Sequence, residues 1–135
     1  MSKRRLVDTN LIVRYLVQDH KQHSAIAAKM FDSCARGELT LVLLPTVVAE
    51  CVFVLESFYK HPRTEIARIL GDLISSRGIE LADLESHRDA LIRYATSKLH
   101  FVDCLIAATA AMVSIPVATL DREFRRFSDV HVELD

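Results

Sequence analysis

Four acidic residues of this chain have the type and the positions that suit metal binding. They are Asp8, Glu50, Asp103 and Asp121, and each stands beside or within an apolar run. A carboxylate in apolar surroundings costs free energy unless a cation compensates its charge. Three of the four have neither Lys nor Arg as a sequence neighbour, so the predicted compensating cation is a metal ion.

The ligand type predicts both the metal and the reaction. Clustered carboxylates repel one another and take up protons unless a divalent cation keeps them ionised. Oxygen ligands without His or Cys favour Mg²⁺ or Mn²⁺ over zinc. Such an ion activates a bound water as nucleophile and stabilises the leaving group when a phosphodiester is displaced. The acids therefore predict a metal-dependent phosphodiesterase, provided that they meet in the folded chain.

Helix capping is the alternative for three of these acids. Asp is a favoured N-cap residue, and Asp8, Asp103 and Asp121 each precede or open a predicted helix. Taken singly, each is as consistent with a cap as with a metal ligand. Glu50 lies too far inside its predicted helix to cap it, and its alternative is a buried ion pair with a distant Arg.

Short predicted strands alternate with predicted helices along the chain. The strands are residues 4–8, 40–44, 79–81, 116–120 and 130–134, and the helices are residues 10–17, 23–36, 46–59, 63–76, 84–97 and 102–114, with a short basic helix from residue 121. Thr46 is the expected cap of the third helix. This alternation predicts an α/β fold with a mostly parallel sheet covered on both faces.

The predicted elements bring the acids to one edge of the sheet. Open parallel sheets bind ligands beyond the carboxyl ends of their strands, and Asp8 and Asp121 both end predicted strands. Asp103 falls in the first turn of a predicted helix, and Glu50 falls within the first two turns of another. We therefore expect all four acids to converge on one site.

Length and composition indicate one ordinary globular domain. The 135 residues predict a single domain over residues 1–135. The net charge of −1 gives no overall positive potential that would indicate a nucleic-acid partner. Acids gathered in a site can, however, offset basic residues elsewhere in the net charge. The three Cys are few and odd in number, which favours buried thiols in a reducing compartment. Cys51 and Cys104 each follow a site acid and are expected in the core.

The amino terminus argues against secretion. Lys3-Arg4-Arg5 precedes an apolar run that Asp8 ends at once, which excludes an ordinary signal peptide. No apolar stretch reaches the length that spans a bilayer. We expect a cytoplasmic protein without a membrane partner.

The four acids lie in four short sequence segments. They are Leu6-Val7-Asp8-Thr9-Asn10, Val47-Val48-Ala49-Glu50, Phe101-Val102-Asp103-Cys104-Leu105-Ile106-Ala107-Ala108 and Thr119-Leu120-Asp121-Arg122-Glu123-Phe124. In this order and with these gaps, the chain resembles the PIN-domain ribonucleases from its first strand to its last. The resemblance is closest to the VapC-type toxins of bacterial and archaeal toxin–antitoxin pairs.

The resemblance implies a three-layer α/β/α sandwich and Mg²⁺- or Mn²⁺-dependent cleavage of RNA. It implies that the four acids are metal ligands or activate the water. It also implies that the Thr119 hydroxyl supports the site, and that Thr9 and Asn10 shape the turn beside it. An antitoxin that wraps the protein and a homodimer are the partners that the family leads us to expect.

Other residues are candidates for binding RNA or a protein. Arg122, Arg125 and Arg126 follow Asp121 and are expected to contact the RNA backbone, with a solvated charged face as the alternative. Residues 46–59 are apolar on more than one face, so this helix is either central in the core or partly a docking surface. His20 and His23 are interpreted as solvated surface residues.

Two other functions remain open. In the first, Asp8 is the covalent nucleophile of a haloacid-dehalogenase-like phosphatase, but that family has a second Asp where this chain has Asn10, and Glu50 then has no role. In the second, the chain is a non-catalytic PIN-like scaffold. Loss of one or more acids is expected of a scaffold, and none is lost here.

Overall fold

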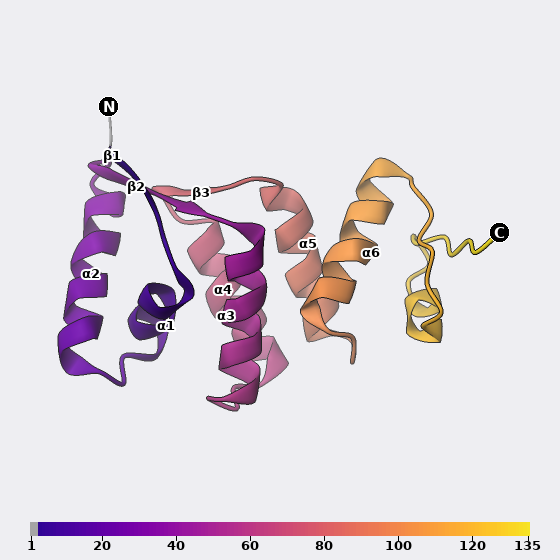
Figure 1. The fold of residues 1–135 in the computed structure, drawn as a ribbon, viewed down its shortest axis with the longest axis horizontal. Helices are drawn as coiled ribbons and strands as arrows, with labels where there is room; N and C mark the ends of the chain where they lie inside the picture. Colours follow the sequence, from indigo (N-terminus) through magenta and orange to yellow (C-terminus); the bar gives the residue numbers. More distant parts are fainter. Residues whose placement is uncertain (1–2) are drawn as a thin grey trace. The chain divides into compact units, whose positions relative to one another are not determined.

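The computed structural model describes residues 3–135, so residues 1 and 2 of the predicted domain lie outside the described residues. The chain divides into two compact units, Met1–Leu84 and Glu85–Asp135, which are called unit 1 and unit 2 below. Each unit is described by itself (Figure 1).

Unit 1 contains a parallel sheet of three strands in the order β1-β2-β3. The strands are β1 (Lys3–Leu6), β2 (Leu39–Leu43) and β3 (Ile79–Leu81). Along the central strand, Leu39, Leu41 and Leu43 are buried, while Thr40 and Val42 are half-buried. This alternation follows from the two-residue period of a strand, which turns successive side chains to opposite faces.

Four helices pack on this sheet. They are α1 (Thr9–Val17), α2 (Lys21–Ala35), α3 (Pro45–Ser57) and α4 (Arg63–Ile74). The first two connect β1 to β2, and the other two connect β2 to β3. Because both connections step across the sheet in the same direction and such crossovers are right-handed, both helix pairs cover the same face. Figure 1 shows the four helices below the strands.

The start of α3 differs from the expectation. Its N-cap is Leu44, no side chain caps it, and Pro45 occupies its first turn, so the prediction that Thr46 caps this helix is wrong. Proline suits this position because it lacks an N–H group that would have no partner there. Proline therefore replaces the cap that a hydroxyl was expected to supply.

One glycine is required for the approach of α2 to the sheet. Gly78 has a φ of +84°, and a Cβ atom at this position would lie 2.5 Å from Cβ of Cys34 and 2.9 Å from the carbonyl oxygen of Leu39. The Gly78 carbonyl accepts a hydrogen bond from the Leu41 N–H at 2.7 Å. Any side chain here would push α2 and β2 away from the turn that leads into β3.

Unit 2 is built around two helices and an irregular carboxyl-terminal segment. The helices are α5 (Leu84–Ala95) and α6 (Phe101–Val113), and α5 begins at the last residue of unit 1. A short 3₁₀ helix, η1 (Arg122–Arg126), follows α6. A small core gathers Ala107, Ala110, Val117, Phe124 and Val130. This core joins one face of α6 to the segment that follows it.

The two strands predicted near the carboxyl terminus are wrong. Among the described residues, 116–120 and 130–134 share only one parallel bridge, between Val117 and Val132. Val117 donates to the His131 carbonyl at 2.8 Å and accepts from the Glu133 N–H at 2.9 Å. Leu120 is 90% exposed. The apolar composition of these segments favours a strand locally, but a strand also needs a hydrogen-bonded partner along its length.

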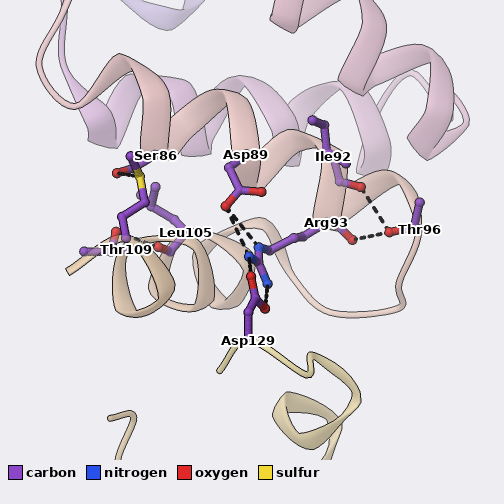
Figure 2. Close-up of polar contacts among 9 residues, drawn as sticks. Ser86, Asp89, Ile92, Arg93, Thr96, Leu105, Thr109 and Asp129 are labelled. Carbon is purple, nitrogen blue, oxygen red and sulfur yellow. Dashed lines mark hydrogen bonds and ion pairs between the residues drawn. The ribbon is translucent and has the colours of Figure 1, made fainter. Parts of the chain in front are cut away.

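A buried arginine ties the carboxyl-terminal segment of unit 2 to α5. Arg93 is only 8% exposed, and its guanidinium donates to Asp89 at 3.2 Å and to Asp129 at 2.9 and 2.5 Å (Figure 2). It also lies over the Phe127 ring, 4.9 Å from the ring centroid. Arg93 lowers the pKa of the Asp129 carboxyl by hydrogen bonding to its charged form. We call this group the Arg93 clamp.

The predicted α/β class with a parallel sheet is confirmed. All six helices and three of the five strands form close to their predicted bounds. The three cysteines are buried and form no disulfide, as expected. No helix among residues 3–135 is long and apolar enough to cross a membrane.

Candidate functional site

Asp8 lies in the turn between β1 and α1 in unit 1, and it caps the helix. Its Oδ1 atom accepts a hydrogen bond from the Leu11 N–H at 3.0 Å. The side chain is exposed, and among residues 3–135 it accepts no other hydrogen bond. A single oxygen therefore serves the cap, and the second oxygen is available to a cation. Capping and metal binding are compatible roles for Asp8.

Glu50 lies in the second turn of α3, also in unit 1. We expected apolar surroundings for this residue, but Glu50 is exposed. The reason is the helical rotation of about 100° per residue, which turns Val48, Cys51 and Val52 inward and Glu50 outward. No hydrogen bond or ion pair joins Glu50 to another described residue, so the alternative of an Arg partner is not observed.

The charges of Asp8 and Glu50 act on the same buried thiol. The pKa of Cys51 is raised to about 12, first by burial and then by the negative charge of Glu50, with a smaller effect of Asp8. Asp8 caps α1 and Glu50 lies on α3, and these two helices are in contact within unit 1. A thiol with this pKa stays protonated at neutral pH, which supports the interpretation of Cys51 as a core residue and not a nucleophile.

Thr9 and Asn10 occupy the turn beside Asp8, as expected. The Thr9 hydroxyl is buried and makes no hydrogen bond of ordinary geometry among the described residues. It lies close enough to the Cys51 sulfur to lower the pKa of that thiol against the larger effect of burial. Sulfur is a weak acceptor, so the contact is loose. Asn10 is exposed.

Unit 2 carries the other two acids. Asp103 is half-buried in the first turn of α6, and it does not cap this helix, whose N-cap is His100. Among residues 3–135 the Asp103 carboxylate has no hydrogen bond or ion pair. The capping alternative is therefore wrong for Asp103, and both of its oxygens are available.

Asp121 caps η1 and is held by Thr119. Its Oδ1 atom accepts from the Glu123 N–H at 2.9 Å, and its own N–H donates to the Thr119 hydroxyl at 3.0 Å. As with Asp8, one carboxylate oxygen serves the cap and the other is available. The contact from Thr119 fixes the backbone that carries the acid.

The carboxylates suit a hard divalent cation, although for a different reason from the one expected. Three of them are exposed and Asp103 is half-buried, so a cost of burial does not call for a metal. The fit lies in the donors themselves, which are carboxylate oxygens with no protein cation paired to them. Neither unit alone, over residues 3–135, gathers three or more ligating side chains. Two of the acids belong to each unit, and Mg²⁺ is commonly held by one or two carboxylates with water and substrate oxygens.

The three arginines after Asp121 differ in their contacts. Arg126 donates to the Thr96 carbonyl at 3.3 Å and lies 3.6 Å from the Glu123 carboxylate. Arg122 and Arg125 are exposed and have no hydrogen bond or ion pair with a described residue. These two guanidinium groups are the better candidates for phosphate contacts.

Sequence reasoning missed a cavity beside Asp8. The cavity has a volume of about 240 Å³ and is lined by Asp8, Asn10, Leu11, Arg14, His23 and Ile26. The interpretation of His23 as a surface residue is confirmed, since its side chain is exposed, and the same side chain forms part of this wall. The four-residue spacing of Asn10 and Arg14 on a helix was the available clue, since it places both on one face.

Comparisons with known proteins support one family. A search of curated proteins finds no match. The family model described as "PIN domain" matches residues 5–130, which is nearly the whole chain and includes all four acids. PIN domains are generally nucleases and typically use divalent metal ions.

Proposed function

Because the chain belongs to the PIN-domain family, we propose that it is a Mg²⁺- or Mn²⁺-dependent endoribonuclease. In this proposal both units form one nuclease domain, and Asp8, Glu50, Asp103 and Asp121 serve one metal site. One observation carries the proposal. Each acid keeps at least one carboxylate oxygen without a partner among residues 3–135, as a metal ligand requires.

The metal supplies the central chemistry when it is bound. Held by these acids, one or two divalent ions would lower the pKa of a water and would stabilise the charge on phosphate oxygens. The Leu11 N–H orients the Asp8 carboxylate, and the Thr119 hydroxyl holds the backbone of Asp121. Contacts of this kind keep ligands in a productive orientation before the substrate arrives. We assign Glu50 and Asp103, which have no such contacts, to the ligands or to the activation of the water.

The substrate in this proposal is RNA. Arg122 and Arg125, exposed on η1 next to Asp121, are the groups that we assign to the phosphate backbone, with Arg126 in a lesser role. Phosphate contacts of this type depend on salt and carry no base specificity.

We further propose that the protein is the toxin of a toxin–antitoxin pair, in the cytoplasm, with an antitoxin and a second copy of the chain as partners. The helix α3 supports a docking role, because Val52 and Leu55 are buried while Phe53 is 67% exposed. Phe58, directly after the helix, is 75% exposed. One face of α3 is therefore core, and the exposed face is the one that we assign to a partner.

The test is cleavage of a mixed pool of tRNA and rRNA by the purified protein. The reactions contain Mn²⁺ or Mg²⁺, or EDTA, and they include the variant Asp8→Asn and the matched control Asp72→Asn, an exposed acid of α4. We expect discrete fragments that require the metal and Asp8 but not Asp72. Fragments that persist in EDTA, or with Asp8→Asn, would contradict the proposal.

Two further outcomes identify the rival functions. A folded protein that neither cleaves RNA nor binds Mn²⁺ would support the non-catalytic scaffold. A beryllofluoride adduct trapped on Asp8 would support the phosphatase with an aspartate nucleophile.

A further inference from the structure

The cavity beside Asp8 has the size and the walls of a binding site for one small planar group. Its volume is about 240 Å³, which is below the roughly 300 Å³ at which sites for drug-sized ligands begin. Leu11 and Ile26 supply apolar walls, and Ile26 is 49% exposed although it is aliphatic. A flat group of the size of a nucleobase suits this space better than a larger ligand.

His23, one of the lining residues, has a preformed orientation. The His23 ring stacks on the His20 ring, with 3.9 Å between the centroids and 21° between the planes. The His20 Nδ1 atom accepts from the His23 N–H at 3.1 Å, which caps α2 and fixes the pair. A stacked imidazole offers a rigid surface to a base, and stacking is the usual way in which unpaired bases are held.

A second wall carries an oriented guanidinium. Arg14 donates through Nη1 to Oδ1 of Asp19 at 2.8 Å, and Oδ2 of the same carboxylate accepts from the Tyr59 hydroxyl at 2.8 Å. The Tyr59 hydroxyl and Arg14 together lower the pKa of Asp19. The Nη2 group of Arg14 has no acceptor among residues 3–135. Because Asp19 and Tyr59 already orient the guanidinium, a ligand does not have to order it.

The Asn10 amide completes the hydrogen-bonding groups of the cavity. It lines the same space, and an amide offers both donors and an acceptor to the edge of a base. Asn and Arg side chains are common readers of purine edges in nucleic-acid complexes. The lining holds one carboxylate and one guanidinium, Asp8 and Arg14, so its net charge favours neither an acidic nor a basic ligand, and a neutral base suits it.

We propose that this cavity binds one unpaired base of the RNA, next to the phosphodiester that is cleaved. Asn10 and Arg14 contact the edge of the base, and His23 contacts its face. Asp8 lines the cavity, so a base held here carries its own phosphate toward a proposed metal ligand. The inference rests on the proposed ribonuclease function, and it makes unit 1 the source of base preference.

The first test reads base preference from the cut ends. A random-sequence single-stranded RNA pool is cleaved with Mn²⁺, and the base frequencies on both sides of the cut are sequenced. Wild type is compared with the variants His23→Ala and Arg14→Lys, the second of which keeps the charge of the side chain but not the planar guanidinium. The control is Gln22→Ala, a substitution of an exposed residue next to His23 on α2.

We expect a base preference at one position next to the cut in wild type and in Gln22→Ala. His23→Ala and Arg14→Lys should flatten that preference and lower kcat/KM on the preferred sequence about tenfold, the size expected for the loss of one stacked base. Base frequencies that are the same in all four proteins would overturn the inference.

A second test does not depend on cleavage. The ¹⁵N-labelled wild-type protein is titrated in EDTA with each of the four ribonucleosides, which carry no phosphate for Asp8 to repel, and amide and side-chain shifts are recorded. We expect shifts at Asn10, Arg14 and His23 that depend on the base. If these shifts occur without any RNA cleavage, the ribonuclease proposal fails and the base site stands. If no nucleoside shifts them, the base site is wrong, and a protein segment becomes the better occupant.

Discussion

The turns that carry Asp8 and Asp121 have the same local design but different supports. Each Asp caps the helix that follows it through one oxygen, and each leaves the other oxygen available. Asp8 follows a strand paired to β2 over four residues and precedes a nine-residue α-helix. Asp121 follows a single bridged residue and precedes a 3₁₀ helix. Regular secondary structure holds the first turn, while individual side-chain contacts hold the second.

This difference predicts unequal sensitivity to substitution. In unit 1 the sheet ladder spreads the support over many backbone hydrogen bonds, so no single side chain decides the position of Asp8. In unit 2 the support depends on the Thr119 hydroxyl and on the Arg93 clamp. Substitutions at these two residues should therefore affect Asp121 in a way that has no counterpart at Asp8.

The largest expected effect is the loss of activity when either acid loses its charge. Asp8→Asn and Asp121→Asn should each lower RNA cleavage at least about 100-fold. Substitution of a residue that only supports a metal ligand costs up to about 100-fold, and loss of a ligand itself should cost at least as much. Asn is also a good N-cap, so the thermal midpoint should hardly change. Cleavage rates and thermal melts check both points, and a fully active Asp103→Asn protein would remove that residue from the site.

The next effect concerns stability and should arise from unit 2 alone. Arg93→Ala removes the clamp and should lower the free energy of unfolding by about 2 kcal/mol, less than a fully buried pair because Asp129 is half exposed. Urea unfolding measures this change. Arg88→Ala, an exposed arginine on the same helix, is the matched control and should change little. Equal effects of the two variants would contradict the role of the clamp.

A smaller effect is expected where Thr119 holds Asp121. Thr119→Val should weaken Mn²⁺ binding and cleavage about tenfold, since second-layer contacts commonly tune metal affinity by this amount. Thr119→Ser keeps the hydroxyl and should restore both. Isothermal titration with Mn²⁺ separates this role from a loss of stability. An unchanged Mn²⁺ affinity in Thr119→Val would show that the hydroxyl does not position the acid for the metal.

The smallest effect is a pH dependence carried by Asp129. Its pKa is lowered in the folded protein, so its ion pair with Arg93 contributes stability above the ordinary value of 3.8 and loses it as the pH falls below that value. The contribution should be under about 1 kcal/mol, because the carboxylate is largely exposed. Urea midpoints of wild type and Asp129→Asn from pH 6 to pH 2 should therefore converge below about pH 4. A constant difference across this range would contradict the assignment.

The four site acids could be identified from the sequence, but the expectation that their carboxylates are buried was incorrect. Their neighbours in sequence are apolar, and this suggested buried charge that needs a metal. On a helix, however, sequence neighbours point in different directions, and Glu50 faces solvent beside the inward Cys51. The order of the four motifs supported the family, and the matching PIN-domain model confirms it.

The sequence by itself determined the features that depend on residues close together in the chain. The helices and the short strands of unit 1 belong to this group, because each is decided by the pattern of a few residues. The tertiary structure decided the rest. Residues 116–120 form no strand because, within the described residues 3–135, their pairing is limited to one bridge. Arg14 is oriented for the cavity because Tyr59, distant in sequence, holds Asp19 in place. Such contacts depend on how elements pack, which local residue patterns do not encode.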